Sequence, residues 1–244
     1  MTHTVLTSAR RGPFLTVSVI VFVVSALATI RWSRAMAVGM TMPGGWTMSM
    51  VWMPMPGQTG LSAAVGFEGM WIAMMAAMML PSLVPTLART RLDVLTSAGY
   101  FAVWAAIGAG VYVVGIALAQ AEVRWATLAL VIPIARGVVL VVAGWVQLTC
   151  WKARHLECYR EGCLGVARPG ASWRRGIALG GHCALCCLPF MAALVVAGMM
   201  NVAVIALTAL AITVERIARA PALPARLAGL IVIGAGVFRI LRTG

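Results

Sequence analysis

The sequence predicts an all-α fold, a polytopic bundle of transmembrane helices with six or seven spans. Of its 244 residues, 62% are hydrophobic and only 10% are charged, and the mean hydropathy is +0.97. Soluble domains carry about 25% charged residues, which cover their surface. The composition therefore excludes a soluble globule, and it also excludes a disordered chain or a disulfide-rich secreted domain.

Seven apolar stretches approach the roughly 20 residues that a helix needs to cross a bilayer. They are continuous rather than alternating, which excludes the strands of a membrane barrel. Lipid then requires each span to satisfy its own backbone hydrogen bonds as a helix. We expect one integral membrane domain over residues 1–244, in contact with the lipid bilayer. The expected spans are residues 13–31, 64–86, 97–119, 128–149, 176–198, 200–216 and 226–242.

Basic residues predict how the chain is oriented. The net charge is +13. We attribute this excess of basic residues to loops that face the negative cytoplasmic leaflet, and not to a surface that binds nucleic acid. With the N-terminus in the cytoplasm, most of the 19 Lys and Arg residues fall inside, as the positive-inside rule requires. The minority on the outer side comprises Arg31, Arg34, Arg124, Arg136, Arg239 and Arg242. Seven spans then place the C-terminus outside, and a bacterial inner membrane is the expected location.

The first span has two interpretations. Arg10 and Arg11 precede it and Ala35-Met36-Ala37 resembles a cleavage site, which fits a signal peptide. Its apolar run of about 18 residues is longer than the usual signal core of roughly 7–15. A retained membrane anchor is therefore the favoured interpretation.

Methionine is concentrated in one part of the chain. Residues 35–62 form a Met-rich segment, expected on the outer side, and the next span continues the pattern. On a helix with 3.6 residues per turn, Trp71 and four methionines share one face. Neutral thioethers bind Cu(I) well, but they also pack helices. Packing is the first interpretation for the helix, and metal binding is the first for the loop. The four methionines are Met74, Met75, Met78 and Met79.

Cysteine forms the second unusual pattern, at the start of the span over residues 176–198. Cys183, Cys186 and Cys187 follow the spacing i, i+3, i+4, so their sulfurs project from one helical face. Met191 extends this face by one turn, and His182 borders it. Thiolates bind Cu(I), zinc or iron–sulfur clusters. The competing interpretation is that free cysteine packs as a small hydrophobic residue.

Three further parts of the sequence contain candidate ligands or ion pairs. Residues 150–175 form a basic inner loop that contains His155 and Cys158 at i, i+3, either as ligands or as chance neighbours. Glu68 lies near the end of its expected span, where it binds a cation, relays a proton or reaches the interface. Glu215 and Arg216 end the sixth expected span and are interpreted as an interface pair.

Several of these elements recur in one family. The shared pieces are residues 71–81 with Pro85, Gly144-Trp145-Val146-Gln147-Leu148 with Lys152, the Cys-x-x-Cys-Cys motif, and Gly198-Met199-Met200-Asn201 with Glu215. With them, the chain resembles the predicted metal-binding integral membrane proteins catalogued as domain of unknown function 2182, over roughly residues 64–240. The resemblance implies metal binding in the membrane but no particular reaction.

These observations predict a membrane protein that handles Cu(I) for transport or for delivery to a cuproenzyme. A metallochaperone or a cuproenzyme is the expected partner, and zinc or iron stays an alternative metal. Two other functions remain open. One is a non-catalytic subunit of a larger membrane complex, and the other is a membrane redox protein that uses the cysteines.

Overall fold

The computed structural model describes residues 2–36, 39–42, 46–53, 57–87, 94–161, 172–218 and 220–243. Within these ranges the chain is almost entirely helical, which confirms the predicted all-α bundle. The helices are α1 (Thr2–Ala35), α2 (Gly60–Leu87), α3 (Val94–Arg124), α4 (Ala126–Gln147), α5 (Cys150–Glu161), α6 (Ser172–Gly198), α7 (Val202–Ile217) and α8 (Ala222–Thr243).

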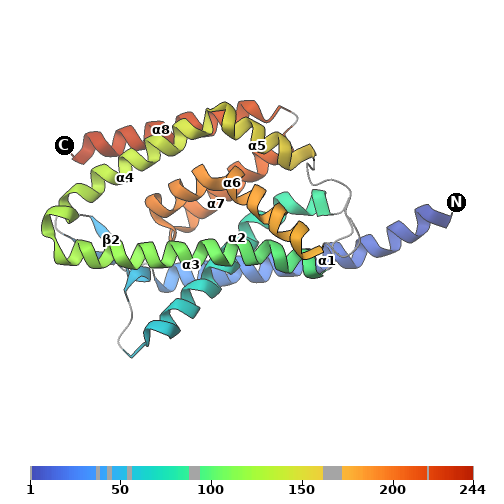
Figure 1. Ribbon diagram of the computed structural model, residues 1–244, viewed down its shortest axis with the longest axis horizontal. Coiled ribbons are helices and arrows are strands. Elements are labelled where there is room, and N and C mark those ends of the chain that lie inside the picture. The colour runs from blue at the N-terminus through green and yellow to red at the C-terminus, as the bar shows by residue number, and fades with distance from the viewer. Residues whose placement is uncertain are drawn as a thin grey trace.

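Six of these helices are long and apolar enough to cross a membrane: α1, α2, α3, α4, α6 and α8. The expected span 200–216 forms α7, whose 16 residues extend only about 24 Å at 1.5 Å per residue. That length is shorter than a bilayer core of about 30 Å. The count of six lies within the predicted range of six to seven. The shorter α7 still returns the chain from the hairpin end to the opposite end of the bundle, so the two termini lie at opposite ends (Figure 1).

Two segments outside the spans have structure that the sequence did not indicate. The Met-rich segment contains a small antiparallel hairpin of β1 (Gly39–Thr41) and β2 (Thr47–Ser49), followed by the 3-10 turn Met50–Trp52. Met48 and Met42 are buried where this hairpin packs against α3 and α4. The expected inner loop begins with the helix α5, so part of that loop is regular structure.

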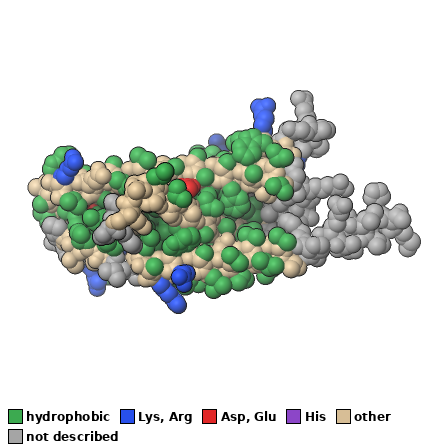
Figure 2. Space-filling model, turned by 90° about the horizontal axis from the view of Figure 1, so that it is seen from below, with side chains coloured by type: hydrophobic (Ala, Val, Ile, Leu, Met, Phe, Trp, Pro, Cys, Tyr) green, Lys and Arg blue, Asp and Glu red, His purple; other side chains and the backbone are tan. Residues whose placement is uncertain are grey.

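The helices are arranged along one long axis (Figure 1). The α4 and α8 helices lie side by side, while α6 and α7 lie between that pair and α3. Large apolar side chains face outward, among them Leu27, Leu207 and Ile231. Figure 2 shows one face covered largely by hydrophobic side chains with few charges, as contact with lipid requires.

Glycines allow the closest helix contacts, as is common in membrane bundles. A Cβ added to Gly176 on α6 would lie 2.2 Å from the Thr96 backbone oxygen on α3, and one added to Gly99 would lie 2.5 Å from the Trp173 oxygen. Both clashes are with backbone, which cannot rotate away. The α3–α6 contact therefore depends on the absence of side chains at these two positions, and this contact fixes where α6 presents its cysteines.

We expect Gly176→Ala to lower the free energy of unfolding by about 1–3 kcal/mol, because the added methyl overpacks the helix contact. Gly181→Ala on the same helix is the matched control, since a Cβ there meets no atom within 4 Å. Thermal unfolding in detergent measures both variants. Equal melting temperatures for the two would contradict the close-contact explanation.

Candidate metal site

Two thiols from one face of α6 meet in the interior of the bundle. The Cys183 and Cys187 side chains are 0% and 1% exposed. The guanidinium of Arg216 on α7 donates from Nη2 to both sulfurs at 3.0 Å. The Tyr100 hydroxyl on α3 lies 3.1 Å from the Cys183 sulfur. The spacing i, i+4 explains why one guanidinium nitrogen reaches both thiols.

A thioether completes the group. The Met79 Sδ on α2 lies 3.8 Å from the Cys183 sulfur and 3.8 Å from Arg216 Nη1. The same Nη1 donates to the Ser82 hydroxyl at 2.7 Å. Two thiols and one thioether thus surround a single guanidinium contributed by a fourth helix. We call these residues (Met79, Ser82, Tyr100, Cys183, Cys187 and Arg216) the thiol–guanidinium cluster.

A buried ion pair adjoins this cluster. Lys152 on α5 lies 2.9 Å from the Glu215 carboxylate on α7, and each side chain is 2% exposed. The Lys152 ammonium also donates to the Cys186 backbone oxygen at 2.6 Å, and Gln147 donates to the other oxygen of Glu215. Buried charges of this kind need polar or charged partners, and here the partners come from different helices. The ion pair therefore joins α5, α6 and α7 close to the cysteines.

Glu215 and Arg216 do not form the interface pair that the sequence suggested. Both are buried, and their partners come from other helices: Lys152 and Gln147 for Glu215, and the thiols for Arg216. Their place near the end of an apolar run suggested the interface, because sequence position carries no information about what packs against a helix end. The burial of Lys152 could not be predicted either, because the residues around it in the sequence are polar and basic and give no sign of a buried side chain.

The methionine face of α2 is buried completely. The four methionines of this face, from Met74 to Met79, are at most 1% exposed, and Trp71 is 0% exposed. They belong to one continuous core with Cys183, Cys187, Met191 and Met199. The Trp71 ring nitrogen donates to the Trp104 backbone oxygen at 2.9 Å, which fixes α2 against α3. This arrangement suits packing, and it places the Met79 thioether against the Cys183 sulfur.

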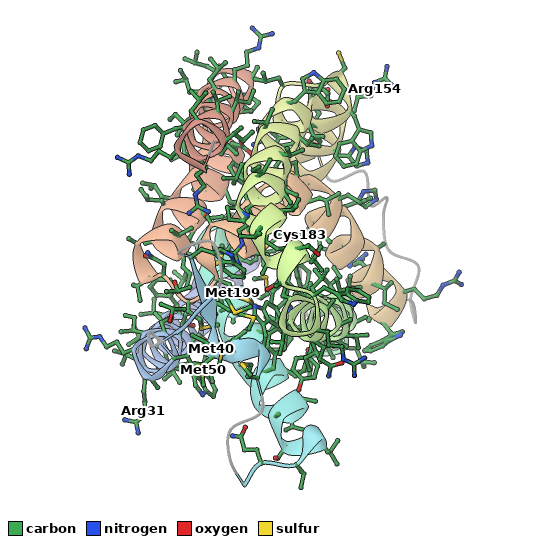
Figure 3. The ribbon with its side chains drawn as sticks, turned by 90° about the vertical axis from the view of Figure 1, so that its left-hand side faces the viewer. Arg31, Met40, Met50, Arg154, Cys183 and Met199 are labelled. Atoms are coloured by element: carbon green, nitrogen blue, oxygen red, sulfur yellow. The ribbon has the colours of Figure 1, made fainter. Side chains whose placement is uncertain are left out.

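Viewed from the hairpin end, Cys183 and Met199 lie toward the middle of the bundle, whereas Arg31 and Arg154 point away from it (Figure 3). The sulfur-rich core therefore runs through the interior from the hairpin end to the thiol–guanidinium cluster.

The remaining predicted residues lie around this core. The His182 Nδ1 and the Glu68 Oε1 are buried and have no hydrogen-bond partner among the described residues. Cys186 is buried beside the thiol pair on α6. His155 packs its ring against Trp151 on its own helix α5, with centroids 4.3 Å apart. The side chain of Cys158 lies outside the described residues. Among the described His, Cys, Asp and Glu side chains, no group of three is arranged to hold a metal ion.

The fold and the site together define a class, a bundle of helices long and apolar enough to cross a membrane, with sulfur side chains gathered in its core. The PpoB2 copper chaperone family model matches residues 68–239, and the chain belongs to this family. This confirms the expected metal-related family and supports an involvement with copper. The match spans the Met face, the cysteines and Arg216, and leaves α1 and the hairpin outside it. Neither the curated proteins nor the solved structures contain a match to the chain.

Proposed function

We propose that this protein binds Cu(I) between the thiolates of Cys183 and Cys187, with the Met79 thioether as third donor, and passes the ion to a cuproenzyme partner. The observation that carries the proposal is the convergence of these three sulfur groups in a buried site. Thiolate and thioether ligands select Cu(I) over harder cations. Copper is here the cargo of the protein.

The formal charges of the site favour a monovalent ion. Without metal, Lys152 and Arg216 against Glu215 leave one positive charge in excess. Two thiolates with one Cu(I) together carry one negative charge, which neutralises that excess. A divalent ion held by the same thiolates would leave the positive charge uncompensated. Because uncompensated charge in a membrane interior is costly, the site favours Cu(I) over zinc or iron(II).

The buried methionines supply a path of neutral donors to the thiols. Met199 and the four methionines of the α2 face belong to the same core as Cys183. Thioethers hold Cu(I) more weakly than thiolates, so an ion moves along them toward the stronger site. In the membrane orientation that we propose, with the N-terminus in the cytoplasm, this path begins at the outer, Met-rich hairpin. His182, Cys186, Met191 and Glu68 border the path as further donors, and His155 with Cys158 forms a separate candidate pair on α5.

We expect Met79→Leu to weaken Cu(I) binding by at least about tenfold, because one donor is replaced by a side chain of similar volume. Competition against a Cu(I)-specific chelator, with the protein in detergent, measures the affinity. Met42→Leu is the matched control, since Met42 is buried in a different cluster beside the hairpin. Equal affinities for the two variants would remove Met79 from the ligand set.

The alternative functions predict other results in the same preparation. A non-catalytic subunit would contain no copper and would co-purify with other membrane proteins. A thiol redox protein would yield a Cys183–Cys187 disulfide on mild oxidation, with no stoichiometric metal.

A further inference from the structure

A cavity of about 940 Å³ opens at the end of the bundle that carries the hairpin. The end of α1, the hairpin, α4, the α6–α7 turn and α8 form its walls. It is separate in position from the thiol–guanidinium cluster, whose residues do not line it. Its size suits a small molecule or complex.

The walls of this cavity are strongly basic. Arg34, Arg136, Arg239 and Arg242 line it, and none of its described lining residues is Asp or Glu. Glu122 on α3, which does not line the cavity, interacts electrostatically with Arg136. Four of the six arginines on the proposed outer side therefore gather around one cavity, on the side where the positive-inside rule disfavours them.

The fold holds two of these arginines in place. The Arg136 guanidinium stacks over the Trp46 ring at 4.2 Å, and the Trp46 ring nitrogen donates to the Ala129 backbone oxygen at 2.9 Å. Arg239 on α8 donates to the Val196 backbone oxygen on α6 at 3.5 Å. The basic wall is thus built by contacts between elements and is not a set of free surface side chains.

Soft donors share the same cavity. Four thioethers line it together with the arginines. Met199 is buried in the core that contains Cys183, and Met36 and Met200 pack against that core. The cavity therefore adjoins the start of the sulfur path. The four lining methionines are Met36, Met48, Met199 and Met200.

The arginines would repel a bare cation, whereas the thioethers bind Cu(I). A Cu(I) complex with a net negative charge is attracted by the arginines and still delivers the metal to the thioethers. From this combination, and resting on the proposed function, we infer that the cavity admits Cu(I) as a small anionic complex with two halide ligands. The arginines attract its negative charge. Within the cavity both copper–halide bonds break and copper–thioether bonds form. Copper stays Cu(I), no electron is transferred, and the two halide ions leave as anions.

The test compares two copper sources with the full chain in detergent. Cu(I) is supplied as the dichloride anion in chloride buffer, or as the cationic acetonitrile complex in a chloride-free buffer of equal ionic strength. The initial rate of copper uptake is measured as protein-bound metal after rapid desalting. Arg136→Gln with Arg239→Gln is expected to slow uptake from the anionic source by at least about tenfold, and to leave uptake from the cationic source unchanged or faster.

Three variants make this result interpretable. Arg136→Lys with Arg239→Lys retains the charge and is expected to restore uptake. Arg34→Gln with Arg242→Gln removes two exposed cavity arginines without touching the Trp46 stack, and is expected to slow the anionic source alone. Arg124→Gln is the control, because Arg124 is an exposed arginine at the end of α3 that does not line the cavity. It is expected to take up copper from both sources at the wild-type rate.

The outcomes separate this inference from the proposed function. If both cavity variants take up the anionic complex at the wild-type rate, or slow both sources equally, the anionic-substrate inference is wrong while copper binding stands. If the wild type binds no copper from either source, the proposed function fails and the inference fails with it.

Discussion

Replacing both Cys183 and Cys187 by serine is expected to abolish stoichiometric copper binding. Serine keeps the size and the hydrogen-bonding capacity, so Arg216 retains two acceptors in place of the sulfurs that it contacts at 3.0 Å. What is lost is the soft donor, because a hydroxyl oxygen binds Cu(I) poorly. We therefore expect copper content to fall to background while the melting temperature of the metal-free protein changes little. Elemental analysis of the purified variant beside the wild type measures the first quantity.

The control for this experiment is Cys150→Ser, which removes an exposed thiol at the start of α5. It is expected to bind copper as the wild type does. Undiminished copper in the double variant, with copper still lost on treatment with a Cu(I) chelator, would place the ion elsewhere in the chain. The buried methionines would then be the next set of donors to replace.

The second large effect is expected at the buried ion pair. Glu215→Gln should destabilise the protein by about 3–5 kcal/mol, because it leaves the Lys152 ammonium buried without a counter-charge. Lys152 is 2% exposed in its side chain and retains only neutral acceptors in the variant, among them the Cys186 carbonyl. A thermal or denaturant unfolding experiment in detergent measures the loss.

Two further variants define the origin of that loss. Lys152→Met combined with Glu215→Leu removes both charges and should recover most of the stability, as replacement of buried ion pairs by apolar residues often does. Glu157→Gln on α5 removes an exposed carboxylate and should change stability by no more than about 0.5 kcal/mol. A single Glu215→Gln variant as stable as Glu157→Gln would show that Lys152 reaches water.

Local patterns were sufficient for the long apolar helices. Long apolar runs predict spanning helices because lipid offers no partner for backbone groups, and six such helices form. The Met pattern of α2 predicts a shared face because of the helical period, and that face is buried. The hairpin within residues 39–49 was not predicted, since its strands are three residues long and stabilised by packing on α3 and α4 rather than by β-propensity.

The sequence by itself determined that this chain is a bundle of long apolar helices rich in sulfur side chains, because composition and helical period are local properties. Only the tertiary structure decided that Arg216 reaches both thiols, that Lys152 pairs with Glu215, and that four arginines surround one cavity. These contacts join different helices, and which helix faces meet depends on close approach at small residues such as Gly99 and Gly176. Distances between separate helices are a property of the packed bundle, and no single segment of the sequence contains them.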